Sequence, residues 1–131
     1  MRIICDTHAL LFWSDAQDRL GKSALLTMEH ALTTKTLACS DVSLWEIAML
    51  FAKGRLRQDV NAVHYMNDII AALELEVLPV TPEIAVLAQS TIFHHKDPAD
   101  RLIGATAIHC KAKLVTADAF LQGIPGLEII W

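Results

Sequence analysis

The amino-acid sequence predicts an α/β fold in which helices cover both faces of a parallel β-sheet. Short apolar segments alternate along the chain with longer segments that have helical spacing. The short segments are apolar throughout, which is typical of parallel strands buried between two layers of helices. The chain has 131 residues, and no repeat, linker or low-complexity tract divides it. We therefore expect a single domain over residues 1–131.

Up to Gly54, we expect two strands and three helices. A short apolar run ends at Asp6, and a second one lies between polar residues and ends at Ser40. A helix is expected to begin at Ser43 and to stop at Gly54, because glycine is favoured just beyond the last helical turn. The expected strands are residues 2–5 and 36–40, and the expected helices are residues 8–13, 22–32 and 43–53.

Beyond Gly54, we expect three more strands and three more helices. Pro82 and Pro98 each follow a potential N-cap residue, and an acid lies in the first turn of each helix. Because crossovers between parallel strands are right-handed, functional residues are expected at the carboxyl ends of the strands. The expected strands are residues 75–80, 114–116 and 127–130, and the expected helices are residues 60–73, 82–90 and 98–113, with a helical turn at 119–122.

Composition limits the class of protein. Hydrophobic residues make up 53% of the chain, which indicates a folded globule. No apolar stretch approaches the ~18 residues of a membrane span, and Asp6 comes too early for the apolar core of a signal peptide. We therefore expect a cytoplasmic protein that does not enter a membrane. Cys5, Cys39 and Cys110 are unclustered and odd in number, which favours buried thiols over disulfides or a zinc site.

The charge distribution is compatible with a nucleic-acid partner only if the acids are concentrated in one place. The net charge is −4, whereas binding to a phosphate backbone favours a basic surface. Four acids taken up by a metal site would leave −4 + 4 = 0. A local basic stretch, KGRLR, spans residues 53–57.

Four carboxylates fall at the same kind of place in the predicted fold. Asp6, Glu46 and Asp118 come within a few residues of the end of a strand, and Asp100 lies in the first turn of a long helix. In a parallel sheet these places converge on one crevice. Clustered carboxylates repel one another unless a cation offsets their charge, and Mg²⁺ or Mn²⁺ suits an all-oxygen site.

Each of these acids also has a structural alternative. Glu46 could complete a capping box with Ser43, and the helix dipole favours Asp100 in a first turn. Asp6 and Asp118 could cap the helices that follow them. These structural alternatives are partly independent, so all four are less probable together than any one of them alone. The joint occurrence of the four acids therefore favours a metal site. Divalent ions held by carboxylates can polarise a phosphoryl oxygen and activate water, which points to phosphodiester hydrolysis.

Two other phosphoryl-transfer classes fit less well. A haloacid-dehalogenase-like phosphatase needs a second aspartate two residues after the first, whereas Asp6 is followed by Thr7 and His8. A receiver domain needs paired acids after the first strand and a late lysine, and these are missing.

The chain resembles PIN-domain ribonucleases of the VapC toxin type. The resemblance is carried by DTHALLFW, SLWEIA, HHKDPADRLIGATA and LVTAD, and it extends to VLPVTPEIA and LEIIW. It implies a PIN-like fold, with a five-stranded parallel sheet and helices on both faces, and a homodimer. It further implies an endoribonuclease that hydrolyses RNA with water activated by Mg²⁺ or Mn²⁺. Such a protein is the toxin of a type II toxin–antitoxin module and is silenced in a complex with a cognate, VapB-like antitoxin. The alternative is a catalytically silent PIN-like interaction module.

The resemblance also assigns roles to individual residues. The acidic quartet, which binds metal and catalyses, falls on Asp6, Glu46, Asp100 and Asp118, and supporting hydroxyls fall on Thr7 and Thr116. Contacts to RNA or antitoxin, with a solvated surface as the alternative, are expected for Lys53, Arg55, Arg57 and Arg101.

The roles of several neighbouring residues are less specific. Asp97 is expected to be an N-cap, and whether it or Asp41 joins the metal site is left open. The His8 side chain is expected to point away from Asp6. A polar loop that could touch phosphate comprises His94, His95 and Lys96, and side chains expected in a core or interface are Leu11, Phe12, Trp13, Trp45 and Phe51.

Overall fold

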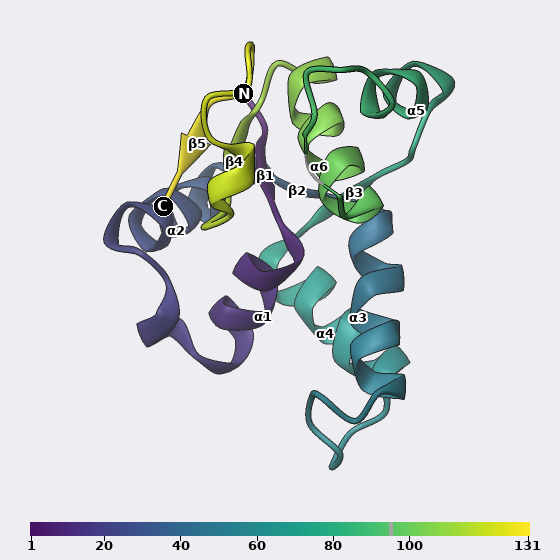
Figure 1. Ribbon diagram of the computed structural model, residues 1–131. Helices are drawn as coiled ribbons and strands as arrows, with labels where there is room; N and C mark the ends of the chain where they lie inside the picture. Colours follow the sequence, from purple (N-terminus) through teal and green to yellow (C-terminus); the bar gives the residue numbers. More distant parts are fainter. Residues whose placement is uncertain (95) are drawn as a thin grey trace.

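The protein is described by a computed structural model that covers residues 1–94 and 96–131. Within this part of the chain, five strands form one parallel sheet (Figure 1). The order across the sheet is β3-β2-β1-β4-β5, and Ile4 of β1 pairs with Ala38 of β2 and Leu114 of β4. The strands are β1 (Ile3–Cys5), β2 (Leu37–Ser40), β3 (Glu76–Leu78), β4 (Lys113–Val115) and β5 (Ile129–Ile130).

The helices fall where the sequence pattern predicts them, with small shifts at their ends. None of the helices in the described residues has the length and hydropathy to span a bilayer. The α-helices are α1 (Thr7–Asp15), α2 (Lys22–Thr34), α3 (Val42–Ala52), α4 (Ala62–Leu73), α5 (Pro82–Ala88) and α6 (Pro98–His109), and the short 3₁₀ helices are η1 (Gln17–Arg19) and η2 (Ala119–Leu121).

Helices cover both faces of the sheet, as predicted. Successive strand residues alternate between two hydrophobic clusters, because side chains along a strand point to opposite faces. Cys5 and Val115 pack with α1, α2, α3 and α4 on one face. Ile4 and Leu114 pack with α5, α6 and η2 on the other. The prediction that Cys5 and Cys39 are buried is confirmed, whereas Cys110 is only half-buried.

Two expected boundaries were wrong. Helix α3 begins at Val42, so Ser43 is its second residue and not its N-cap. Glu46 therefore lies in the second turn, and the capping box with Ser43 does not form. Helix α6 ends at His109, four residues earlier than expected, because Lys111 adopts a left-handed conformation and Lys113 joins β4 beside Ile3.

The strand order creates a crevice at the carboxyl end of β1. From β1 the chain continues to β2 and β3 on one side, and it returns to β4 and β5 on the other. The point where the chain changes direction across a parallel sheet is where such folds bind ligands. In Figure 1, β1 runs from the N-terminus down into α1, so this junction lies at the carboxyl end of the central strand.

Candidate metal centre and active site

Asp6 connects β1 to α1 and is held from both sides. Its backbone amide donates to the carbonyl of Val115 (3.0 Å), which continues the pairing of β1 with β4. Its Oδ1 accepts a hydrogen bond from the amide of Ala9 (2.7 Å), as an N-cap does. Its Oδ2 accepts a hydrogen bond from the Thr116 hydroxyl. The side chain is therefore buried, with both oxygens oriented by neighbouring groups.

Thr116 links Asp6 to Asp118. It follows β4 and is fully buried, and its Oγ1 also accepts a hydrogen bond from the amide of Asp118 (3.1 Å). Asp118 is the N-cap of η2 and accepts from the amide of Phe120 (2.9 Å). The predicted cap roles of Asp6 and Asp118 are thus real, and they place both carboxylates at the carboxyl edge of the sheet.

Glu46 reaches the same region from α3. Its Oε1 accepts a hydrogen bond from the hydroxyl of Thr7, the first residue of α1. The Thr7 Oγ1 also lies 3.0 Å from Oγ of Ser43, which is fully buried. Thr7 therefore orients Glu46 much as Thr116 orients Asp6.

Asp97 and Asp100 complete a group with Glu46. Ligand oxygens of these three carboxylates lie within 4.8 Å of one another. Asp97 also serves as the N-cap of α6, because its Oδ1 accepts from the amide of Ala99 (2.9 Å). The cap role predicted for Asp97 is confirmed, and the same side chain also belongs to the acidic group. Asp41 instead accepts a hydrogen bond from the amide of Val80 (3.4 Å).

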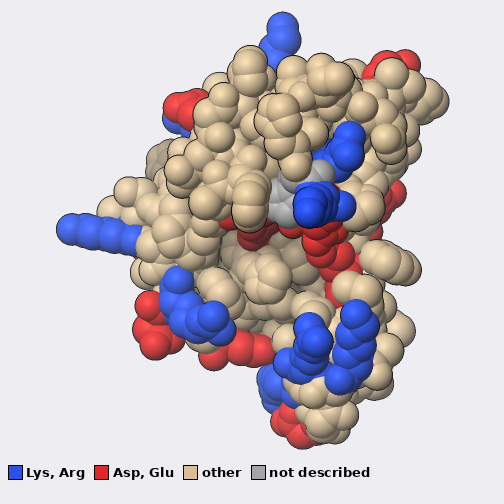
Figure 2. Space-filling view, in the orientation of Figure 1, with Lys and Arg blue, Asp and Glu red and all other residues tan. Residues whose placement is uncertain are grey.

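Asp100 belongs to both sets of acids. It groups with Glu46 and Asp97, and it also lines a pocket of about 290 Å³ together with Asp6 and Asp118. Figure 2 shows this face, where Asp and Glu side chains lie along the edge of a central hollow and Lys and Arg side chains flank it. The structure therefore brings all four sequence-predicted acids to one site.

The electrostatics of the site favour binding of a cation. Burial raises the pKa of Asp6, and the charge of Asp118 adds to this, while the hydrogen bonds from Thr116 and Ala9 oppose it. Burial also raises the pKa of Glu46, and the charges of Asp97 and Asp6 add to it, while the hydrogen bond from Thr7 opposes it. A bound cation would offset this repulsion.

The donor set fits a hard divalent cation. Glu46, Asp97 and Asp100 offer carboxylate oxygens only, and Asp6 and Asp118 extend the set across the pocket. All-oxygen sites of this type suit Mg²⁺ and Mn²⁺. The residues present are therefore suited to hold such an ion.

Comparison with known proteins adds the family. The family model for the PIN domain matches residues 3–126. This chain belongs to the PIN domain family. It is 31% identical over 121 residues to Ribonuclease VapC22 of Mycobacterium tuberculosis, an alignment that covers 92% of this chain and 89% of that protein.

Solved structures share the fold of this PIN domain. A chain in the crystal structure of VapBC2 from Rickettsia felis, bound to a promoter DNA fragment, superposes with a TM-score of 0.74 at 17% identity. That match covers 100% of both chains. A chain in DNA-bound VapBC from Salmonella typhimurium gives a TM-score of 0.71 at 16% identity and covers 98% of this chain and 96% of the other. At such identities the likeness confirms the fold.

The predicted basic contacts are dispersed around this PIN domain. Lys53, Arg55 and Arg57 are exposed beyond the end of α3. Arg57 pairs with Asp59 (2.7 Å) and is 3.9 Å from Asp15. The Nε of Arg101 donates to the carbonyl of Ala88 at the end of α5 (2.7 Å), so this side chain has a structural role. His94 and Lys96 are exposed, and His95 lies outside the described residues.

Three pocket residues were missed or misplaced by the sequence analysis. His8, which was expected to point away from Asp6, lines the same pocket. Because Asp6 caps α1, the helix begins at Thr7, and its first turn places His8 beside the pocket. Phe12 and Trp131 also line the pocket. The position of His8 could have been predicted from the sequence, because an N-cap at Asp6 fixes where α1 begins. The position of Trp131 could not, because it depends on the pairing of β5 with β4.

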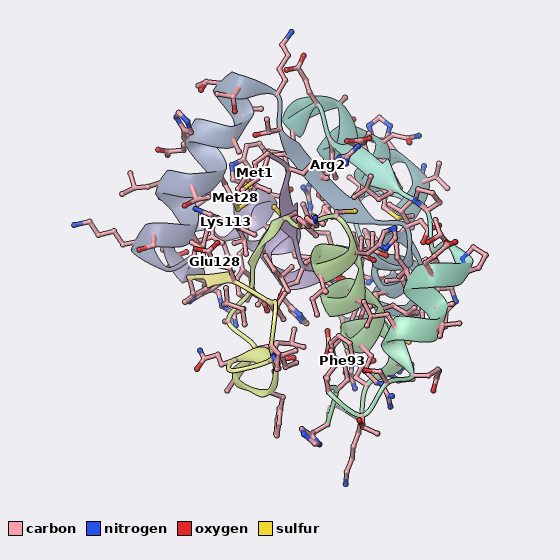
Figure 3. All side chains as sticks on the ribbon, turned by 90° about the horizontal axis from the view of Figure 1, so that it is seen from above. Met1, Arg2, Met28, Phe93, Lys113 and Glu128 are labelled. Atoms are coloured by element: carbon pink, nitrogen blue, oxygen red, sulfur yellow. The ribbon has the colours of Figure 1, made fainter. Side chains whose placement is uncertain are left out.

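A larger groove lies elsewhere and has different chemistry. Its volume is about 570 Å³, and Met1, Thr34 and Lys113 are among the residues that line it, between α2 and the amino ends of β1 and β4 (Figure 3). Among the described residues that line it, none carries a carboxylate side chain. Size alone therefore does not identify the functional site in this fold.

Proposed function

We propose that this single PIN domain is a metal-dependent endoribonuclease, the toxin of a type II toxin–antitoxin module. The observation that carries the proposal is the position of Asp100, which belongs to two carboxylate sets at the carboxyl edge of the sheet. The 31% identity to a protein named as a ribonuclease supports RNA as the substrate class.

In this proposal, Asp6, Glu46, Asp100 and Asp118 hold Mg²⁺ or Mn²⁺. When bound, a divalent ion lowers the pKa of water and stabilises charge on a phosphoryl oxygen. Thr116 and Thr7 hold the Asp6 and Glu46 carboxylates in place, and such supporting hydrogen bonds tune metal sites. Asp97 adds a third carboxylate beside Glu46 and Asp100.

The partners follow from the same relatives. Structures with this fold include toxin–antitoxin complexes, which supports a cognate VapB-like antitoxin that silences the enzyme in a heteromeric complex. We further propose a cytoplasmic homodimer. Exposed Lys53, Arg55 and Arg57 supply positive charge for RNA or for an acidic antitoxin segment.

The test uses the full chain purified without antitoxin. We expect cleavage of RNA in Mg²⁺ or Mn²⁺, loss of cleavage in EDTA, and loss in Asp100→Asn. The matched control is Asp68→Asn, an exposed aspartate on α4 beside His64, which should leave activity unchanged. Equal activity in Asp100→Asn would indicate a contaminating nuclease and contradict the site.

A binding measurement separates the enzyme from the alternative of a silent interaction module. Mg²⁺ or Mn²⁺ should raise the melting temperature of wild type more than that of Asp100→Asn, because an ion that binds the folded state stabilises it. A metal-dependent rise in the melting temperature without RNA cleavage would favour the silent module.

A further inference from the structure

The pocket that contains the acids has an aromatic wall. Phe12 of α1 and Trp131, which follows β5, line the same pocket as Asp6, Asp100 and Asp118. The two rings meet edge to face, with centroids 6.3 Å apart and an interplanar angle of 65°. Both rings also pack against the hydrophobic cluster on this face of the sheet, so the wall is held in place by the core and presents its remaining surface to the acids.

The wall is fixed relative to Asp6. The amide of Thr116 donates to the carbonyl of Ile130 (3.1 Å), and the hydroxyl of the same Thr116 donates to Asp6. Trp131, the next residue after Ile130, is therefore positioned by the residue that orients the acid. A Cβ at Gly21 would lie 2.4 Å from the backbone carbon of Trp131 and 2.7 Å from its indole Cδ1, so Gly21 packs closely against this residue.

A second groove continues from the wall. It has a volume of about 350 Å³ and shares His8 and Phe12 with the acid pocket. Arg19 and Arg55 also line it, and the guanidinium of Arg19 lies over the Phe12 ring, 4.2 Å from its centroid. The two pockets are thus neighbours on either side of His8 and Phe12, with Asp6, Asp100 and Asp118 in one and Arg19 and Arg55, together with Asp15, in the other.

This order of groups suits a single nucleic-acid strand. Proteins bind single strands by stacking bases on aromatic side chains and by placing cations along the backbone. In a duplex the bases remain stacked on one another and cannot reach a side wall. Arg19 lies over the Phe12 ring, whereas Trp131 is half-buried and lines the acid pocket, so the indole is the better candidate surface for a base.

We propose that Trp131 stacks a nucleobase of single-stranded RNA beside the phosphodiester that is cut, and that Arg19 and Arg55 receive the adjoining backbone. This inference rests on the proposed ribonuclease function and adds the residue that holds a base of the substrate strand next to the acids. Trp131 is thus a substrate-binding residue.

The test measures binding to an uncleaved strand. The Asp100→Asn protein is titrated with a short oligoribonucleotide without secondary structure, and a single abasic site is moved along it. We expect one abasic position to weaken binding about 10-fold, because one stacked base is lost. Combined with Trp131→Leu, which keeps an apolar side chain without a π face, the same abasic site should cause no further loss. Trp131→Phe should retain the sensitivity.

The control is Trp45→Ala, because Trp45 is 63% exposed on α3 and lines neither groove. It should keep the full abasic effect. An abasic effect of equal size in Trp131→Leu and in the parent protein would overturn the proposal, as would the lack of any abasic effect in a parent that binds RNA. If the wild-type chain cleaves no RNA in any metal, the ribonuclease proposal itself fails, which is a different outcome.

Discussion

Two groups of carboxylates meet in this PIN domain, and they are held in different ways. The strand-end pair, Asp6 and Asp118, follows β1 and β4 and is tied together by Thr116. The helix group, Glu46, Asp97 and Asp100, comes from α3 and from the start of α6. Asp6 is buried, whereas Asp97 is exposed.

The difference shows what each group needs from the rest of the fold. Sheet register sets the strand-end pair, because the Asp6 amide pairs with Val115 and Thr116 pairs with Ile130. The helix group depends on the packing of α3 against α6, which brings three like charges within 4.8 Å. Hydrogen bonds from Thr116 and the Ala9 amide fix both oxygens of the buried Asp6, whereas in the helix group three carboxylates lie together and a cation would relieve their repulsion.

The largest loss of activity is expected on substitution of Asp100, which lies near both groups of carboxylates. Asp100→Asn should lower kcat/KM for RNA cleavage by at least about 100-fold, because in the proposed site Asp100 binds the metal directly and a direct ligand matters more than its supporting partners. Steady-state cleavage of a defined RNA gives the value. A loss no larger than that of Asp118→Asn would show that Asp100 does not connect the groups.

Substitution of Thr116 and of Thr7 allows a direct comparison of the two groups. Thr116→Val removes the hydroxyl that orients Asp6 and should lower kcat/KM about 100-fold, near the upper end for supporting residues. Thr7→Val removes the corresponding contact to the half-buried Glu46 and should cost about 10-fold. Both substitutions keep the side-chain shape. The reverse order of the two losses would mean that the strand-end pair is not the more preorganised one.

One buried carboxyl from each group, Asp6 and Glu46, predicts a pH dependence of stability in metal-free protein. Burial raises the pKa of Asp6 and Glu46, so the folded chain holds these protons to higher pH than the unfolded chain does. The free energy of unfolding should therefore fall as pH rises from the ordinary carboxyl pKa, about 4, through the raised values.

Urea unfolding in EDTA over a pH series measures this fall, and Asp6→Asn should make it shallower. The control is Asp68→Asn, whose carboxylate is exposed on α4 and should leave the slope as in wild type. A wild-type slope in Asp6→Asn would show that the buried carboxyl does not carry the effect.

The smallest effects are expected at Asp97, where two roles can be separated. Asp97→Asn keeps an N-cap and removes a charge, so the metal concentration needed for half-maximal activity should rise while stability is kept. Asp97→Ala removes the cap as well and should lower the free energy of unfolding by about 1 kcal/mol. Equal metal dependence in wild type and Asp97→Asn would leave Asp97 with its cap role alone.

The fold was predictable because short stretches of sequence are enough to indicate its strands and helices. Buried parallel strands are apolar on both faces, and Pro82 and Pro98 mark helix starts. The end of α6 was missed because the left-handed turn at Lys111 uses a residue type that gives no turn signal. Glu46 was placed one turn too early, because Ser43 resembles an N-cap but its hydroxyl lies against Thr7.

The site was predictable only in part, for a related reason. Asp6, Asp100 and Asp118 stand beside strand ends or a helix start, where the position in the chain predicts the position in space. A capping residue satisfies a local rule, so the second role of Asp97 leaves no mark in the sequence. Trp131 reaches the pocket through the pairing of β5 with β4, and that contact joins distant parts of the chain.

Gly21 offers a way to alter the pocket without touching its acids. Any side chain at this position would meet the backbone and the indole of Trp131, and would push the aromatic wall aside. None of the carboxylates depends on Gly21 for a hydrogen bond given above. Substitutions in the loop before α2 can therefore change which RNA strand the pocket accepts. The carboxylates that carry out hydrolysis would stay as they are.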